Sequence, residues 1–406
     1  MIALRRGLLA AYVVGLGCSI TLSEGALLLL TLLWLWRLLD SDVRGVQVWP
    51  LWAPVLAFAA ATLLSAFWSG EVTQSLAASK GLLLMAALYV TADALESTGE
   101  TDRFLSWLAL AAGAAAVAGI LQVVACPSHD PTLQPAHGLG RWFFHRCDRA
   151  RGFFSIYMTL AGVLNLVLLA TLPRLLPGAF RRLSMPLWLV TLGGLVATST
   201  RGAWLGLVAG AAALLPMSRR GRLVLLAGLV LLPAIFLLGP QDLRHRFRSM
   251  FDPAEAGITE RFYMWRSATL MWRERPLVGW GPGGVKRVYS QFAQPGAFKQ
   301  RTGHVHNTPL QILVERGALG FAAWLAIWLG FYWHAVRLLK RLEVGRTLER
   351  ALVAGSIASV TGFLVAGLSE YNFGDSEVVM VAWTVMALPW AVARGGKPLA
   401  PRADAS

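Results

Sequence analysis

Charged residues are scarce in this sequence. Only 15% of the 406 residues are Asp, Glu, Lys or Arg, whereas an ordinary soluble domain carries about 25%. Hydrophobic residues make up 56% of the chain. This composition argues against a water-soluble enzyme and excludes intrinsic disorder. No A-x-A-type cleavage signal follows the first apolar run, so we predict that this run is not a signal peptide. The chain is predicted to be an integral membrane protein.

Acidic residues are also few, with 22 Asp and Glu against 37 Lys and Arg, which gives a formal net charge of +15. In a soluble protein this excess would indicate nucleic-acid binding. Among long apolar runs it indicates orientation signals and contact with anionic lipids. The expected partners therefore include membrane lipids but no nucleic acid.

About twelve segments approach the 20 or so apolar residues that a spanning helix needs. They are 8–23, 26–39, 51–68, 76–95, 104–125, 154–172, 187–198, 203–215, 223–239, 318–336, 351–368 and 378–393. The first two are predicted to be separated by a break at Ser23-Glu24-Gly25. The predicted fold is an all-α integral membrane protein with about 12 transmembrane helices and a periplasmic helical subdomain.

Lys and Arg residues gather in every second connection, and this pattern places both termini in the cytoplasm. Four regions follow. Residues 1–239 hold nine transmembrane helices and an arginine-rich periplasmic loop, 127–152; residues 240–317 form a large periplasmic loop with amphipathic helices; residues 318–393 hold helices ten to twelve; and residues 394–406 form a cytoplasmic tail.

Several arginines break this rule because they lie on the predicted periplasmic side. Arg201 occupies a tight turn between two apolar segments, and the loop 127–152 contains Arg141, Arg146 and Arg151. The planar, permanently charged guanidinium suits phosphate and diphosphate oxygens. We therefore predict that these arginines bind an anionic group such as a phosphate or diphosphate; the simpler alternative is that they anchor lipid headgroups.

The segment 240–317 is predicted to contain a helix from Glu260 to about Arg273, capped by Thr259 and stopped by Pro276. Its apolar stripe is predicted to consist of Ile258, Phe262, Trp265, Thr269 and Trp272. Arg261 borders one edge of this stripe and Arg266 the other. We favour Arg261 as a ligand-binding residue, with Arg266 secondary.

Two histidines, His304 and His306, precede Asn307 on the same side of the membrane that is predicted to carry the arginines. Histidine is the side chain best suited to proton transfer near neutral pH, so a general base beside a phosphate clamp is predicted. A hydrogen-bonded helix start is the plain alternative. A metal site is disfavoured, since His-x-His supplies at most two ligands and no carboxylate–histidine cluster accompanies it.

Cys126 and Cys147 flank the arginine-rich loop, and an oxidising periplasm would permit a disulfide between them. Such a bridge would contribute roughly 3 kcal/mol and would hold the loop in place.

These motifs, in this order, resemble the O-antigen ligase/polymerase superfamily. The resemblance covers roughly the second half of the chain and rests on Ser199-Thr200-Arg201-Gly202-Ala203, on Arg261 with Trp265, on Pro276-Leu277-Val278-Gly279-Trp280-Gly281, and on His304, His306 and Asn307 ahead of Leu310, Gln311, Leu313, Glu315 and Gly317.

The resemblance implies a cofactor-free, metal-independent inverting glycosyltransferase of the GT-C type in the bacterial inner membrane. Its donor would be a glycan linked to undecaprenyl diphosphate, and its acceptor in a ligase would be the lipid A–core oligosaccharide of lipopolysaccharide. By position, Arg201 and Arg261 would hold the diphosphate, and His306 would be the base with His304 in support.

Two alternatives remain open at this point. A polymerase of the same superfamily would use a second lipid-linked repeat unit as its acceptor. A lipid-linked sugar flippase belongs to another class and is disfavoured, because spans such as 51–68 and 104–125 carry no charge.

Overall fold

The computed structural model describes residues 2–39, 49–126, 143–144, 147–175, 184–216 and 255–395, together with the single residues 222, 238, 241, 244, 248 and 252. Every element in this described part of the chain is a helix. The elements are α1 (Ile2–Cys18), α2 (Ile20–Arg37), α4 (Trp52–Phe67), α5 (Val72–Ala78), η1 (Ser79–Met85), α6 (Ala86–Ala94), α7 (Thr98–Val124), α9 (Tyr157–Thr171), η3 (Leu172–Leu175), α10 (Ser184–Ala197), α11 (Arg201–Ala212), α14 (Ala256–Glu274), α15 (Gly284–Phe292), α16 (Thr308–Arg341), α17 (Thr347–Ala366), η5 (Asn372–Gly374), α18 (Ser376–Met386) and α19 (Leu388–Gly395).

Seven described segments are long and apolar enough to cross a membrane, as expected of an integral membrane protein. They are Ile20–Arg37, Val72–Ala94, Thr98–Val124, Tyr157–Leu175, Thr308–Arg341, Thr347–Ala366 and Ser376–Gly395. Trp52–Phe67 and Met185–Ala197 are shorter apolar helices. The predicted span 223–239 lies almost wholly outside the described residues, and the total of twelve stays a prediction.

The first helical hairpin turns earlier than the sequence predicts. The break falls at Ser19, whose hydroxyl accepts a hydrogen bond from the backbone N–H of Leu22 and caps α2. The backbone of Gly15 packs so closely on the following helix that an added Cβ would lie 2.5 Å from the nitrogen of Ser23. The break at Ser23-Glu24-Gly25 was therefore the wrong prediction, because the cap and the small residue decide the turn.

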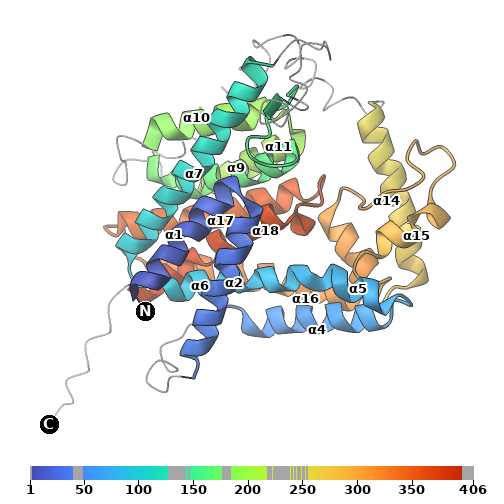
Figure 1. Cartoon of the computed structure of the whole chain (residues 1–406), viewed down its shortest axis with the longest axis horizontal. Helices are drawn as coiled ribbons and strands as arrows, with labels where there is room; N and C mark the ends of the chain where they lie inside the picture. Colours follow the sequence, from blue (N-terminus) through green and yellow to red (C-terminus); the bar gives the residue numbers. More distant parts are fainter. Residues whose placement is uncertain are drawn as a thin grey trace.

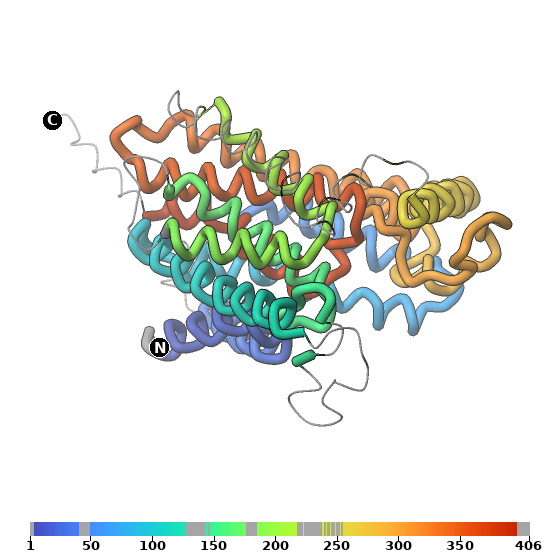
Figure 2. The backbone as a smooth tube through the Cα atoms, turned by 90° about the horizontal axis from the view of Figure 1, so that it is seen from above, coloured from blue at the N-terminus to red at the C-terminus, as the bar shows by residue number. Residues whose placement is uncertain are grey.

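The helices form an elongated bundle with a smaller helical body at one end. In Figure 2 the N-terminus lies at one end of the bundle and α14, in yellow, at the other. Figure 1 shows α17 and α18 running through the middle of the bundle. The segments Tyr157–Leu175 and Ser376–Gly395 are the most deeply buried of the candidate spans, at 72% and 78% of their apolar windows. The hydrophobic core is therefore built around them.

Helices α14 and α15 share a second hydrophobic core with the start of α16 (Figure 1). Its buried members are Met264, Ala268, Met271, Val285, Tyr289, Val305 and Val314. The predicted apolar stripe on α14 was wrong in part: Phe262 is 56% exposed and Met264 lies on the buried face, whereas Trp265 and Trp272 pack against this core. Glu255 rather than Thr259 caps this helix, because its carboxylate accepts from the N–H of Ile258.

Gly317 kinks α16 where the second core meets the bundle. Its φ of +64° lies in the left-handed region that favours glycine. A Cβ at this position would overlap the backbone of Leu277, and the N–H of Leu319 donates to the carbonyl of Leu277. The Pro276–Leu277 segment is thereby held in contact with the backbone at Gly317. Because this segment follows α14, the contact fixes the position of α14 relative to α16.

Candidate functional site

The loop that carries the two histidines is fixed at both the backbone and the side-chain level. Asn307 caps α16 through a hydrogen bond from the N–H of Leu310 (2.9 Å). The N–H of Thr308 donates to the carbonyl of Gly367 (2.7 Å), and its hydroxyl donates to the carbonyl of Glu370 (2.9 Å). The start of α16 is therefore tied to the connection between α17 and α18.

His306 has a left-handed backbone with φ +48°. For a residue other than glycine this conformation costs about 1–3 kcal/mol and persists only where neighbours impose it. Here the adjacent Val305 is held from two sides. Its N–H donates to Gln311 Oε1 (3.0 Å), and its carbonyl accepts from Trp265 Nε1 (3.0 Å). These contacts hold the backbone beside His306 in place and so help to fix the position of its imidazole.

Glu370 joins two of the predicted site residues. Its Oε1 accepts a hydrogen bond from Arg261 Nη2 (2.7 Å), and its Oε2 lies 3.0 Å from His306 Nδ1. The side chains of Glu370 and His306 are only 13% and 14% exposed. With a proton on Nδ1 facing the carboxylate, Nε2 becomes the nitrogen that can accept a proton. A base oriented by a third group is the arrangement that catalytic dyads and triads use.

Arg201 is the first residue of α11 and reaches toward the same region. Its Nη2 donates to Glu255 Oε1 (3.0 Å), so the carboxylate that caps α14 also holds this guanidinium. This hydrogen bond lowers the pKa of Glu255 and keeps it charged. A Cβ added to Gly202 would overlap the hydroxyl of Ser369 and lie 3.5 Å from Glu370 Cγ. The N-terminus of α11 therefore packs directly against the Ser369–Glu370 connection.

Three predicted residues thus lie around one connection: Arg201 begins the helix that packs against Ser369–Glu370, and Arg261 and His306 contact Glu370 itself. They come from α11, from α14 and from the loop before α16. The first turn of α11 adds the positive end of a helix dipole, which favours anions. Two guanidinium groups, a helix N-terminus and an oriented imidazole can bind a diphosphate and remove a proton from a nearby hydroxyl.

His304 lies against His306, with ring centroids 4.3 Å apart in a T-shaped arrangement. Burial, together with the neighbouring imidazole, lowers the pKa of His304 to about 4. It is therefore neutral at pH 7 and too weak a base to compete for a proton. The geometry favours His306 as the base and leaves His304 a packing role beside it.

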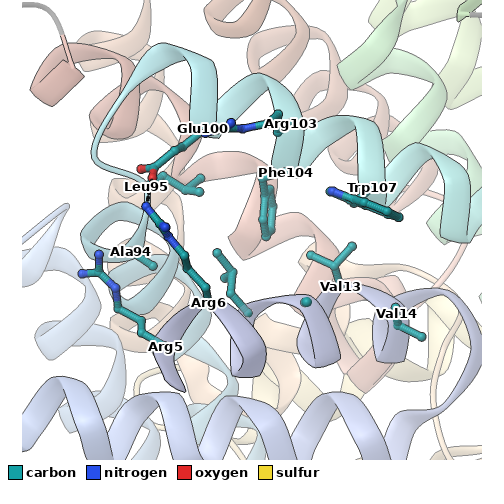
Figure 3. A pocket seen from close by; sticks show the side chains of 12 residues that line it. Arg5, Arg6, Val13, Val14, Ala94, Leu95, Glu100, Arg103, Phe104 and Trp107 are labelled. Atoms are coloured by element: carbon teal, nitrogen blue, oxygen red, sulfur yellow. Dashed lines mark hydrogen bonds and ion pairs between the residues drawn. The ribbon is translucent and has the colours of Figure 1, made fainter. Parts of the chain in front are cut away.

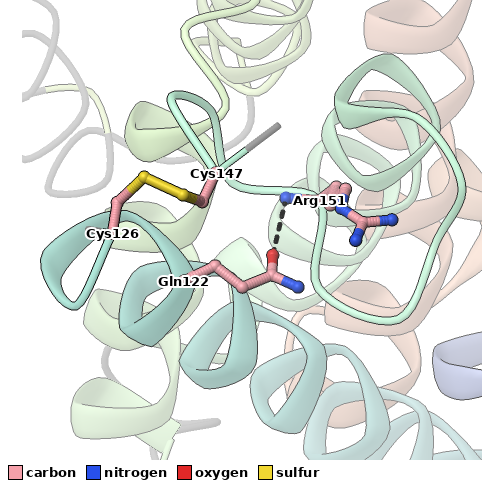
Figure 4. The surroundings of a disulfide bond; sticks show 4 residues. All are labelled: Gln122, Cys126, Cys147 and Arg151. Atoms are coloured by element: carbon pink, nitrogen blue, oxygen red, sulfur yellow. Dashed lines mark hydrogen bonds between the residues drawn. A yellow bond between two sulfur atoms is a disulfide. The ribbon is translucent and has the colours of Figure 1, made fainter. Parts of the chain in front are cut away.

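The loop after the disulfide lies next to the turn that carries Arg201. The structure joins Cys126 and Cys147 in a disulfide, with their Cα atoms 5.6 Å apart. Gln122 on α7 accepts from the N–H of Arg151 (Figure 4). It also accepts from the N–H of Gly152 and donates to the carbonyl of Gly152. The N–H of Ala150 donates to the carbonyl of Ala197 (3.1 Å), at the end of α10.

Arg151 is therefore fixed on the same end of the bundle as Arg201, and its side chain is 7% exposed. Arg141 and Arg146 lie outside the described residues. Arg266 is exposed and sits five residues from Arg261, about 140° around α14. The structure thus separates Arg266 from the cluster that contains Arg261.

Sequence reasoning missed the carboxylates, Glu370 and Glu255. The available signal for Glu370 was an acidic residue in a short connection between two apolar spans, on the face already rich in arginine. Within the described part of the chain, no three His, Cys, Asp or Glu side chains are grouped as a metal site would require.

Comparison with known families gives one match. Residues 186–325 match the model of the family described as O-antigen ligase. This segment contains Arg201, Arg261, His304 and His306. The match supports membership of the O-antigen ligase superfamily, as the motifs indicate, and this family suggests a glycosyltransferase-like activity. No curated protein matches the chain.

Proposed function

We propose that this protein is an O-antigen ligase. It transfers a glycan from undecaprenyl diphosphate to the lipid A–core oligosaccharide at the periplasmic face of the bacterial inner membrane. The supporting observation is that Glu370 contacts both Arg261 and His306, so that a phosphate-binding cation and a base share one carboxylate. The family match over residues 186–325 supports the same reaction class.

In this proposal Arg201 and Arg261 bind the diphosphate of the donor. Each guanidinium has five N–H donors, so one contact to a carboxylate leaves others for phosphate oxygens. Glu255 and Glu370 hold the two groups in position before the donor arrives. Preorganised cations stabilise the negative charge that grows on a departing diphosphate, and they do so without a metal ion.

His306 activates the acceptor. Its Nε2 removes the proton of the acceptor hydroxyl while that oxygen forms a bond to the anomeric carbon and the carbon–oxygen bond to the diphosphate breaks. The carboxylate of Glu370 stabilises the resulting imidazolium through Nδ1. Neutral His304 does not oppose this positive charge. Attack from the side opposite the leaving group inverts the anomeric carbon.

The decisive experiment supplies the purified protein with a glycan linked to undecaprenyl diphosphate and with one of two acceptors. Product on lipid A–core, with inverted anomeric configuration by NMR, supports the ligase. Longer glycan on the lipid carrier would instead identify a polymerase. Movement of the donor across vesicles without a covalent product would identify a transporter.

A further inference from the structure

A pocket of about 500 Å³ lies between α1 and the α6–α7 segment, at the opposite end of α7 from the disulfide. Its lining comes from residues 5–14 of α1, from the end of α6 and from the start of α7 (Figure 3). Because α7 has 27 residues, it is about 40 Å long. The pocket is therefore separated from the Arg201–His306 site by about the thickness of a membrane.

One part of the pocket is apolar. Val13 and Phe104 form its buried wall, at 2% and 5% exposure, while Val14 and Trp107 are 47% and 62% exposed. Beyond them the two helices meet closely, since a Cβ on Gly17 would lie 2.6 Å from that of Ala111. This contact closes the pocket toward the middle of the bundle. An exposed Trp beside valines is typical of a surface that faces lipid near the membrane boundary.

The other part of the pocket is positively charged. Arg5, Arg6 and Arg103 line it together with Glu100 (Figure 3), and Glu96 lies just outside the lining. Arg5 is engaged by Glu96 at 2.6 Å and is 13% exposed. Arg6 contacts Glu100 at 3.3 Å and is 68% exposed. An exposed ion pair of this kind contributes little, so Arg6 can exchange Glu100 for another anion.

We propose that this pocket binds one anionic phospholipid. The headgroup phosphate takes N–H donors from Arg6 and Arg103, and an acyl chain lies along Val14 and Trp107. Basic pockets between transmembrane helices on the cytoplasmic side are suited to anionic headgroups, and the sequence predicts the cytoplasm on this side. The apolar wall below the arginines favours a lipid over free phosphate, which would leave that wall uncovered.

The proposal is independent of the proposed glycosyl transfer, because no residue is shared between the two sites. It assigns a lipid to a part of the molecule that the donor diphosphate does not need to reach. A phospholipid held here would bridge α1 and α7 and stabilise their packing.

The test measures lipid binding to purified full-length protein by native mass spectrometry, with phosphatidylglycerol and phosphatidylcholine added separately in detergent. We expect the wild type to retain phosphatidylglycerol in preference to phosphatidylcholine. Replacing both Arg6 and Arg103 with Gln should weaken phosphatidylglycerol binding about thirty-fold, as the loss of two cations near an anionic headgroup predicts. The matched control is Arg341→Gln, which removes an exposed arginine from the last turn of α16.

The substitution Glu100→Gln is expected to change phosphatidylglycerol binding in the opposite direction. Gln at this position can still accept the N–H of Glu96 but no longer competes for Arg6. It should bind phosphatidylglycerol more tightly than the wild type. Equal retention of both lipids by the wild type and the double variant would overturn the proposal. Displacement of phosphatidylglycerol by inorganic phosphate at equal concentration would also overturn the proposal. That result would identify a phosphate site that does not recognise the lipid part of the molecule.

Discussion

His306 and Glu370 lie 64 residues apart in the sequence, and their side chains meet at 3.0 Å between Nδ1 and Oε2. The contact fixes which imidazole nitrogen faces outward. It also connects the base to Arg261, which holds the other oxygen of the same carboxylate at 2.7 Å. In the proposed reaction, this one side chain links the activation of the acceptor to the neutralisation of the leaving group.

The first prediction concerns the base itself. His306→Gln should lower kcat for glycan transfer by about 10²–10⁴, the usual contribution of a positioned general base. The matched variant His304→Gln should retain most of the activity, because His304 is already neutral at pH 7. Initial rates with purified proteins of equal thermal stability check this. Similar losses in both variants would show that His306 has no special role.

The second prediction concerns the carboxylate that orients the base. Glu370→Gln removes the charge that stabilises the imidazolium, and we expect kcat to fall about a hundredfold. Glu370→Asp should recover part of this loss. Binding of the lipid-linked donor, measured by titration, should change much less than kcat in both variants. A loss confined to donor binding, with kcat unchanged, would show that Glu370 acts only by positioning Arg261 and not on His306.

The third prediction compares two arginines on one helix. Arg261→Ala should reduce transfer by about 10²–10³, as does the loss of one preorganised donor at a developing negative charge. Arg266→Ala on the exposed face of α14 is the control and should leave the rate nearly unchanged. We expect Arg201→Ala to behave like Arg261→Ala. Equal activity of the Arg261 and Arg266 variants would contradict the assignment of the diphosphate site.

The fourth prediction concerns the disulfide. Replacing Cys126 and Cys147 with Ser should lower the free energy of unfolding by about 3 kcal/mol, since a bridge across 21 residues restricts the unfolded chain. Transfer activity should fall as well, because the segment that follows Cys147 is hydrogen-bonded to the end of α10, beside the turn with Arg201. Cys18→Ser is the control, as Cys18 is the free cysteine in α1. If the double variant had the stability and activity of the wild type, the disulfide would have neither a stabilising nor a positioning role.

The fifth prediction concerns pH. The pKa of His304 falls from 6.5 to about 4 on folding, so the unfolded chain binds a proton more readily than the folded one. His304 should therefore destabilise the fold progressively as the pH drops from about 6.5 to about 4, by up to about 3 kcal/mol. His304→Phe should reduce this acid sensitivity. The measurement compares the thermal unfolding midpoints of the two proteins at pH 7 and pH 4.5. An equal drop of the midpoint in both proteins would contradict the predicted role of His304.

Much of the candidate site could be predicted, because the type and the sequence neighbours of its residues indicate their chemistry. Arg201 stands out as a charge between two apolar helices, and His306 as an imidazole beside a helix start. Glu370 could not be assigned in this way, because an acidic residue in a short connection is usually just solvated. The role proposed for Glu370 depends on its contact with Arg261, which is 109 residues away in the sequence. That contact in turn depends on which face of α14 is turned toward the bundle.

The sequence by itself determined that the chain is an apolar helical membrane protein, and it predicted that the arginines and histidines of the candidate site share one face of the membrane. Apolar run length and residue type are local properties, and they act through hydropathy and charge alone. Only the tertiary structure decided which side chains meet, where the first hairpin turns and which stripe of α14 is buried. Those outcomes depend on helix caps, on small residues that allow close backbone contact, and on ion pairs between distant segments.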